Sequence, residues 1–296
     1  ETYTTSKHRV MTNGAVSKVG RSSWDAVYPD YFSGSSLYFH LVPEAGMQFN
    51  DSTYTSIDGR ILPVEIYASL TNTWWPEFVK GTPKYLAELE KDYGAFPHSK
   101  VVVYGVCIMY GGMEYCGATI TSSSALGHEL THSYFARGVM PANGASGWMD
   151  EAIASWRDSG YKQLQGLTHG ATNMATYSPY KRDTDSKAYR EGRDLLAHLD
   201  YLLQDQALPG LKSALRNLAA EKMHKRLFTP ALQSHLEQHI AAGTGGGLPA
   251  AGIDVEALFN KYVYCEGARE ESAESEPQLE NPMHPRLTRE QLDSII

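Results

Sequence analysis

The sequence predicts an α+β protein, in which a strand-rich segment is followed by a helix-rich one. Short runs of alternating polar and apolar residues fall within the first 70 residues, whereas apolar residues recur at helical spacing in the second half of the chain. The chain has 296 residues and is 42% hydrophobic, which is enough for a sizeable core and a length of about two domains. This order of strands and helices is typical of α+β folds.

The strand-rich part of the chain contains three expected strands and one helix. The strands are residues 36–42, 61–66 and 101–104. The first two alternate between polar and apolar side chains, and the third is a continuous apolar run typical of a buried strand. Residues 76–93 begin with a proline and carry apolar side chains at roughly helical spacing, so they predict a helix.

The second half of the chain is expected to be mainly helical. The serine run 122–124 offers hydroxyl groups that could cap a helix starting near Ala125. Further helices are expected at residues 148–160, 186–205, 209–222, 229–241 and 254–262. Leucines form one stripe along residues 186–205, which predicts a helix with one buried face. The glycine-rich residues 243–247 predict a flexible loop.

Charge and hydropathy exclude two classes of partner. The net charge is −8 and no dense basic block occurs, so a nucleic-acid partner is not expected. The longest apolar run, residues 101–110, has ten residues, whereas a membrane-spanning helix needs about 20. The charge is also uneven, because residues 266–296 carry eight acidic residues and three arginines. This composition predicts a solvated, weakly structured tail.

The cysteines bear on the compartment. Cys107 and Cys116 flank the Gly111-Gly112 pair and could form a disulfide across a hairpin, or remain as two buried free thiols. Cys265 is left over. The possible disulfide and the abundance of Tyr, Ser, Thr and Gly favour an extracellular or periplasmic location.

The most informative stretch is Gly127-His128-Glu129-Leu130-Thr131-His132. Two histidines four residues apart lie on one face of a helix, where both imidazoles can reach one tetrahedral zinc ion. Glu129 follows the first histidine and points toward the open coordination position, where it can accept a proton from water. The third ligand is expected to be Glu151, nineteen residues after His132, on a second helix that folds back onto the first. One zinc ion is therefore expected.

This pattern of His-Glu-x-x-His and a later Glu resembles the M1 aminopeptidase family of gluzincins. The resemblance covers about residues 70–267 and implies a thermolysin-like zinc peptidase domain, with a small mixed sheet and a helical lobe, over residues 71–267. A β-rich segment would precede it at residues 1–70, and the acidic tail would follow at residues 268–296. Asp158 matches an acidic position in the family's second helix, where it could orient a ligand histidine; a plain surface carboxylate is the alternative.

Three further stretches carry the resemblance: residues 111–115, 188–196 and 228–267. Residues 111–115, Gly-Gly-Met-Glu-Tyr, are similar to the family's Gly-x-Met-Glu-Asn exopeptidase motif, with Tyr115 in place of Asn; the M61 glycyl aminopeptidases also vary at this position. The resemblance implies an edge strand, formed by Gly111, Gly112 and Met113 with Glu114, that pairs with the substrate backbone. It also implies that Glu114 binds the substrate's free α-amino group. The alternative is a simple Gly-Gly hairpin with an exposed glutamate.

Residues 188–196 resemble the family segment whose tyrosine stabilises the oxyanion, and Tyr189 occupies that position. Tyr180 is a rival, but it lacks the glycine and the paired leucines that follow Tyr189. A phenol suits this role because it donates a hydrogen bond without carrying charge.

Together these residues predict a zinc-dependent aminopeptidase that acts on peptides or proteins. The alternatives are a zinc endopeptidase with an open cleft and a zinc-bearing binding protein without turnover. His235 and His239 are also four residues apart, but no glutamate follows His235, so both are expected to be surface histidines. Trp74-Trp75-Pro76 is expected to be a core or hinge packing site.

Overall fold

A five-stranded mixed sheet lies at the centre of the structure. The structure is a computed structural model that describes residues 7–21, 23–107, 111–175, 184–244 and 252–265. The strand order is β5-β6-β7-β9-β8. The strands are β5 Met47–Thr55, β6 Ile61–Ser69, β7 Val101–Gly105, β8 Gly112–Tyr115 and β9 Ala118–Thr121. β7 runs parallel to both β6 and β9, whereas β5 and β8 are antiparallel to their neighbours. β8 is therefore an edge strand, which leaves its outer backbone groups without a strand partner.

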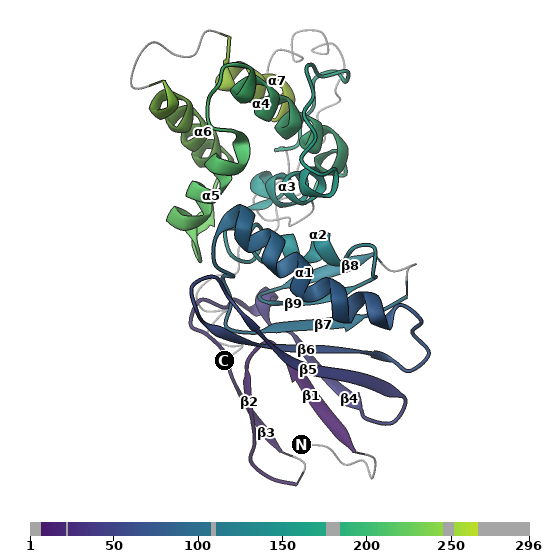
Figure 1. Ribbon diagram of the computed structural model, residues 1–296. Coiled ribbons are helices and arrows are strands. Elements are labelled where there is room, and N and C mark those ends of the chain that lie inside the picture. Colours follow the sequence, from purple (N-terminus) through teal and green to yellow (C-terminus); the bar gives the residue numbers. More distant parts are fainter. Residues whose placement is uncertain (1–6, 22, 108–110, 176–183, 245–251, 266–296) are drawn as a thin grey trace, which may run out of the picture.

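Helices cover one face of this sheet (Figure 1). α1, Trp75–Tyr93, lies directly on the sheet and buries Phe78, Leu86 and Leu89 in the main core. Gly105 allows this close approach, because a Cβ atom there would lie 2.6 Å from the Phe78 ring.

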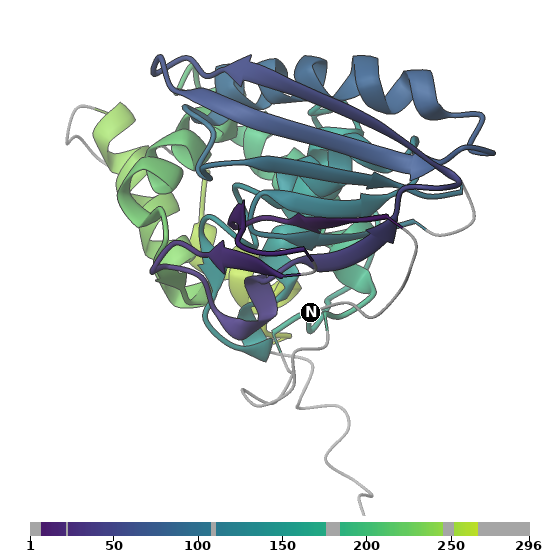
Figure 2. The ribbon, with the colours of Figure 1, turned by 90° about the horizontal axis from the view of Figure 1, so that it is seen from below.

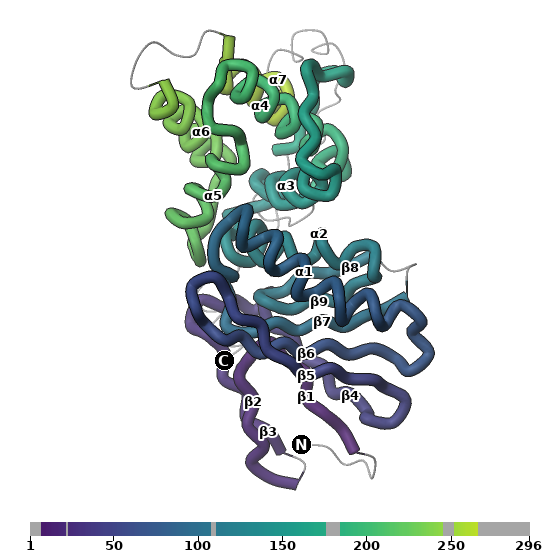
Figure 3. The backbone as a smooth tube through the Cα atoms, in the orientation of Figure 1, coloured from purple at the N-terminus to yellow at the C-terminus, as the bar shows by residue number. Residues whose placement is uncertain are grey.

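Most of the remaining helices form a lobe beyond α1, as the backbone trace in Figure 3 shows. They are α3 Trp148–Asp158, α4 Arg193–Asp205, α5 Leu211–Lys222, α6 Thr229–Gly243 and α7 Val255–Tyr262. The short helix α2, Leu126–Thr131, lies beside α1 and contacts β8 and β9. A π-helical turn, Ala188–Gly192, leads into α4 and packs closely on α3, because a Cβ atom at Gly192 would lie 2.8 Å from that of Ala152. One continuous apolar core joins this lobe to the sheet.

The amino-terminal segment packs on the opposite face of the sheet (Figure 2). It contains two antiparallel strand pairs, β1 His8–Thr12 with β4 Phe39–Pro43, and β2 Ala15–Lys18 with β3 Trp24–Val27. A second, smaller apolar cluster joins the segment to the sheet through Met11, Tyr38, Val42, Tyr67, Val102 and Ala118. A short 3₁₀ turn, Gly34–Ser36, precedes β4. The two faces of the sheet are thus covered by different parts of the chain.

The predicted α+β class is confirmed, and several local expectations need correction. The expected strand at 36–42 starts only at Phe39. The serine run does not cap α2, whose N-cap is Ala125 without a side-chain hydrogen bond. The backbone N–H of Ala125 instead donates to the carbonyl of Ser122 in the preceding turn. The acidic tail expected at 268–296 lies outside the described residues.

The cysteines follow the free-thiol alternative, except that only one of the two thiols is buried. Cys107 and Cys116 are both free thiols, the first exposed and the second buried. The reason is topological: β9 lies between β7 and β8, so the segment ending in Cys107 does not form a hairpin with the strand before Cys116. This removes one argument for an oxidising compartment, and the extracellular or periplasmic location stays a prediction.

None of the helices in the described part of the chain is both long and apolar enough to cross a membrane.

Candidate active site

Three donor side chains converge between α2 and α3. The ligand atoms of His128, His132 and Glu151 all lie within 4.8 Å of one another. Nε2 of His128 is 3.0 Å and Nε2 of His132 is 3.4 Å from the same oxygen, Oε2 of Glu151. The histidines reach one point because they are one turn apart on α2, and Glu151 meets them from the first turn of α3.

The outer nitrogen of each imidazole has its own partner. Nδ1 of His128 lies 2.7 Å from Oδ2 of Asp158, at the end of α3. Nδ1 of His132 donates to the carbonyl of Phe135 at 3.2 Å. Partners of this kind orient a ligand histidine and leave Nε2 free to bind a metal. Asp158 is therefore at the position expected for a residue that orients His128.

An ion-pair chain behind Asp158 extends to α1. Arg157 is 3.2 Å from Asp158 and 2.8 Å from Glu88. Gly127 makes room for this arginine, because a Cβ atom there would lie 2.2 Å from Nη1 of Arg157. Sequence reasoning missed Arg157, although its place directly before Asp158 was a usable signal.

The close approach of these charged groups shifts the pKa values of His128 and Glu151. Burial lowers the pKa of His128, but hydrogen bonds to Asp158 and Glu151 outweigh burial and raise this pKa to about 9. Burial raises the pKa of Glu151, but hydrogen bonds from the two histidines hold it well below its usual range. Glu151 is therefore ionised near neutral pH, as a metal ligand must be. Metal binding here is coupled to the loss of protons from the histidines.

Glu129 faces the same space from α2. Its side chain is buried, and within the described residues its Oε2 atom has no hydrogen-bond partner. Burial is the main reason that the pKa of Glu129 is raised to about 7. The edge strand β8 packs closely against this carboxylate, since a Cβ atom at Gly112 would lie 2.1 Å from Oε1 of Glu129. A buried, unpaired carboxylate oxygen beside a donor set of this kind is suited to hold a water molecule.

Glu114 approaches from the edge strand. Gly112 and Glu114 are two residues apart on β8, so they share the face that looks toward α2. The carboxylate of Glu114 also lies within 4.8 Å of ligand atoms of Glu129 and His132. It forms an ion pair with Arg137 at 2.9 Å, and both side chains are largely buried.

Arg137 is a second residue that sequence reasoning missed. It lies in the turn after α2, where its backbone N–H donates to the carbonyl of His132 at 3.0 Å. Its neighbour Ala136 has φ 142°, a conformation that favours glycine. Nothing in the spacing of the motif indicated that this turn would bring an arginine to Glu114.

Tyr189 completes the cleft from the π-helical turn before α4. Its ring stacks on that of His128, with centroids 6.3 Å apart and planes 10° apart, and it is 45% exposed. Burial and the nearby Glu151 carboxylate raise the pKa of the phenol, which therefore stays protonated. Turns of the π type occur frequently at functional sites. The rival Tyr180 lies outside the described residues.

The structure brings all of the candidate residues together around one cleft of about 490 Å³. Those that line it are Gly111, Gly112, Met113, Glu114, His128, Glu129, Glu151, Asp158 and Tyr189. His132 lies beneath the cleft and is almost fully buried.

The second histidine pair lies elsewhere. His239 is near the surface and bonds to the carbonyl of Pro209 at 2.9 Å. The expectation of a surface residue is wrong for His235, which is buried and forms a hydrogen bond with the carbonyl of Ala214 at 2.9 Å.

Trp74 is not a core residue, because 42% of it is exposed.

A small mixed sheet with a helical lobe, and a His-His-Glu donor set on two adjacent helices, form an architecture known from zinc metallopeptidases. Solved structures bear this out. An M1 zinc metallopeptidase from Deinococcus radiodurans matches with a TM-score of 0.64 and 16% identity, over 94% of this chain and 64% of that chain. A mutant M1 zinc metallopeptidase from the same organism, bound to the substrate Tyr-Ser-Ala, matches with a TM-score of 0.61 and 16% identity, over 85% of this chain and 60% of that chain.

Legionella pneumophila aminopeptidase A in complex with aspartic acid matches with a TM-score of 0.60 and 12% identity, over 86% of this chain and 33% of that chain. No protein-family model matches the sequence, and no curated protein does. This chain spans about three fifths of the length of the Deinococcus structures and a third of the Legionella one. At these identities the likeness is one of fold. The chain therefore has the fold of M1 zinc metallopeptidases, as its resemblance to that family implied.

Proposed function

We propose that this protein is a zinc-dependent aminopeptidase that removes residues from the amino-terminal end of peptides. The observation that carries the proposal is the position of Glu114. This carboxylate lies on an edge strand, in the same cleft as Glu129 and the three converging donor atoms. A carboxylate at that place can select a chain end over an internal peptide bond, because only a chain end carries an ammonium group.

The donor set fits zinc. Two imidazole nitrogens and one carboxylate form a set that zinc prefers, and three protein ligands leave one position open for catalysis. The orienting partners of both histidines and the unpaired buried oxygen of Glu129 support the same assignment. His128, His132 and Glu151 would hold the ion. When bound, zinc supplies Lewis acidity, which polarises the peptide carbonyl and makes water more acidic.

The protein's own residues then transfer the proton of the attacking water and stabilise the negative charge on the intermediate. Glu129 accepts the proton of the attacking water and passes it to the leaving amine. Tyr189 donates a hydrogen bond to the oxygen of the tetrahedral intermediate. The outer edge of β8 pairs with the substrate backbone, as an extended peptide pairs with an exposed sheet edge. One oxygen of Glu114 accepts from Arg137, and the other is left to accept from the substrate ammonium group.

Cleavage of one peptide in two forms tests the proposal. With a free amino terminus, we expect the peptide to lose single residues from that end, and a chelator should stop the reaction. The acetylated form should be cleaved only weakly, because its amide cannot pair with Glu114. Mass spectrometry of the products checks both results. Internal cleavage of both forms would instead indicate an endopeptidase, and no chelator-sensitive cleavage at all would contradict a zinc peptidase.

Replacing Gly112 with alanine is expected to lower kcat about 100-fold, because the new methyl group displaces the Glu129 carboxylate. The atom in the way is the end of a side chain, so the free energy of unfolding should fall by only about 1 kcal/mol. Steady-state kinetics and chemical denaturation measure the two effects. Zinc content serves as the control and should not change, since the three atoms nearest to a Cβ at Gly112 all belong to Glu129 and not to a proposed ligand. An unchanged kcat would show that the edge strand does not restrain Glu129.

A further inference from the structure

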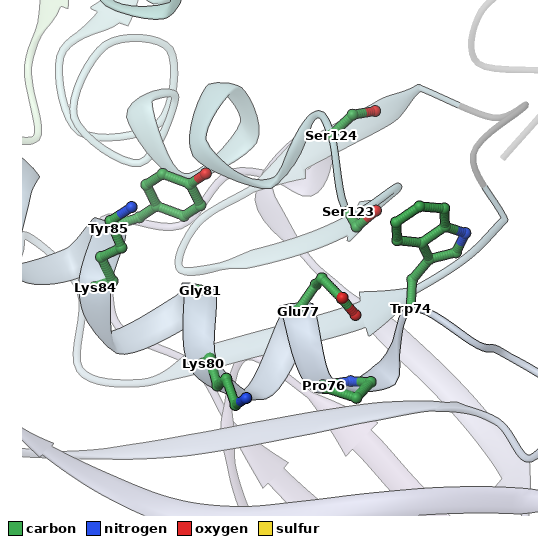
Figure 4. Close-up of a pocket in the computed structure, with 9 residues that line it drawn as sticks. All are labelled: Trp74, Pro76, Glu77, Lys80, Gly81, Lys84, Tyr85, Ser123 and Ser124. Carbon is green, nitrogen blue, oxygen red and sulfur yellow. The ribbon is translucent and has the colours of Figure 1, made fainter.

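A second groove, of about 470 Å³, lies beside the catalytic cleft on the exposed face of α1 (Figure 4). Its other wall is the turn between β9 and α2, which contributes Ser123 and Ser124. Ser124 also lines the catalytic cleft, so the two hollows adjoin at this residue. The groove therefore lies where a substrate that is longer than the cleft could continue.

The side chains of the groove come from one face of α1. Trp74, Glu77, Lys80 and Lys84 follow one another at intervals of three or four residues, which is the spacing of a single helix face. Trp74 and Glu77 extend from α1 toward the serine turn (Figure 4). Gly81 also lines the groove, and it allows α1 to pack closely on α2, because a Cβ atom there would lie 3.1 Å from Leu126.

The direction of the edge strand determines which part of a substrate would reach this groove. The backbone N–H of Ser122 donates to the carbonyl of Gly111 at 2.8 Å, so the start of β8 lies beside the serine turn. Glu114 lies toward the other end of the strand. Resting on the proposed function, a peptide whose ammonium group is at Glu114 and whose backbone pairs with β8 leaves the cleft beside Ser124. Its downstream residues then enter the groove.

The charge changes sign along this path. Four carboxylates line the catalytic cleft: Glu114, Glu129, Glu151 and Asp158. The groove carries two lysines and one glutamate. Neither lysine forms an ion pair with another residue in the part of the chain that the structure describes, and the Lys84 ammonium lies 5.7 Å from the centre of the Tyr85 ring. Both ammonium groups are thus available to a carboxylate of a bound molecule.

We propose that this groove is an extended substrate site, which binds the downstream part of the peptide and selects a segment with an acidic side chain. Lys80 and Lys84 pair with that carboxylate, and the exposed indole of Trp74 packs against the peptide chain. The substrate class is therefore a peptide with a free amino terminus and an acidic residue several positions downstream.

The test compares three substrates. Two are peptide amides of about 12 residues, which span about 40 Å when extended and differ only in downstream Glu or Gln. The third, alanine 4-nitroanilide, ends before the groove. The variants are Lys80→Ala/Lys84→Ala and Trp74→Ala. Lys91→Ala is the matched control, because Lys91 is an exposed lysine on the same helix that does not line the groove.

The double lysine variant should lower kcat/KM about 5-fold or more for the Glu peptide, and less than about 2-fold for the Gln peptide and the anilide. Trp74→Ala should weaken both long peptides but not the anilide. Equal effects on all three substrates, or no effect on the Glu peptide, would overturn the proposal. The amide ends ensure that any response comes from a side-chain carboxylate.

A binding measurement separates this proposal from the proposed activity. Fluorescence anisotropy with the labelled Glu and Gln peptides is measured on zinc-loaded Glu129→Gln, with and without the lysine substitutions. Tighter binding of the Glu peptide that is lost with the lysines supports the groove even if no substrate is cleaved. Equal binding of the two peptides overturns it, even if the wild-type protein is an active aminopeptidase.

Discussion

Replacing Glu129 with glutamine is expected to lower kcat about 1,000-fold while the protein still binds one zinc ion. Glutamine keeps the size of the side chain but cannot accept the proton of the attacking water. The carboxylate is buried beside the donor set, and its Oε2 atom has no hydrogen-bond partner among the described residues. Replacing this oxygen with an amide nitrogen therefore breaks no hydrogen bond of Oε2 among the described residues. Steady-state kinetics and atomic absorption of the purified protein measure the two quantities.

The matched control is Glu151→Gln, since Glu151 is proposed as a ligand and Glu129 is not. This variant should lose zinc and activity together, whereas Glu129→Gln should lose activity alone. Loss of zinc from Glu129→Gln would make Glu129 a ligand and the assignment of the base wrong. Activity within about tenfold of wild type would show that another group accepts the proton.

The predicted convergence of His128, His132 and Glu151 depends on local geometry, and the structure shows these side chains together. The four-residue interval between His128 and His132 is translated by any α-helix into two imidazoles on one face. Glu151 was expected there because the second helix begins close enough in the sequence for the connecting segment to fold it back onto the first. The position of β8 at the edge of the sheet depends on strands that are distant in the sequence, and only the resemblance to a known family indicated it. The structure shows β8 at the edge of the sheet.

The expectations that failed depended on long-range arrangement. The disulfide, one of two alternatives for Cys107 and Cys116, assumed that β7 and β8 were neighbours, but a later strand, β9, lies between them. Arg137 reaches Glu114 only because the turn after α2 bends back, with Ala136 at positive φ. His235 has the sequence context of a surface histidine, but its helix packs it against the carbonyl of Ala214. None of these contacts leaves a periodic signal in the sequence.

Replacing Glu114 with glutamine is expected to lower kcat/KM about 100-fold for peptides with a free amino terminus, while the weak cleavage of acetylated peptides stays unchanged. The carboxylate is 20% exposed, so its ion pair with an ammonium group is only partly screened by water. Loss of such a pair costs about 2–3 kcal/mol, which corresponds to about 100-fold. The ratio of kcat/KM values for the free and acetylated forms of one peptide measures the effect.

Arg137 complicates this result, because Glu114→Gln also leaves the arginine without its ionic partner. An unpaired, largely buried guanidinium group would lower the free energy of unfolding by about 1–3 kcal/mol and could itself distort the edge strand. The double variant Glu114→Gln/Arg137→Gln removes both charges and should restore most of that stability. If Glu114 recognises the ammonium group, the double variant still fails to distinguish free from acetylated peptides. If it regains the wild-type ratio, the arginine caused the loss, and Glu114 only neutralises Arg137.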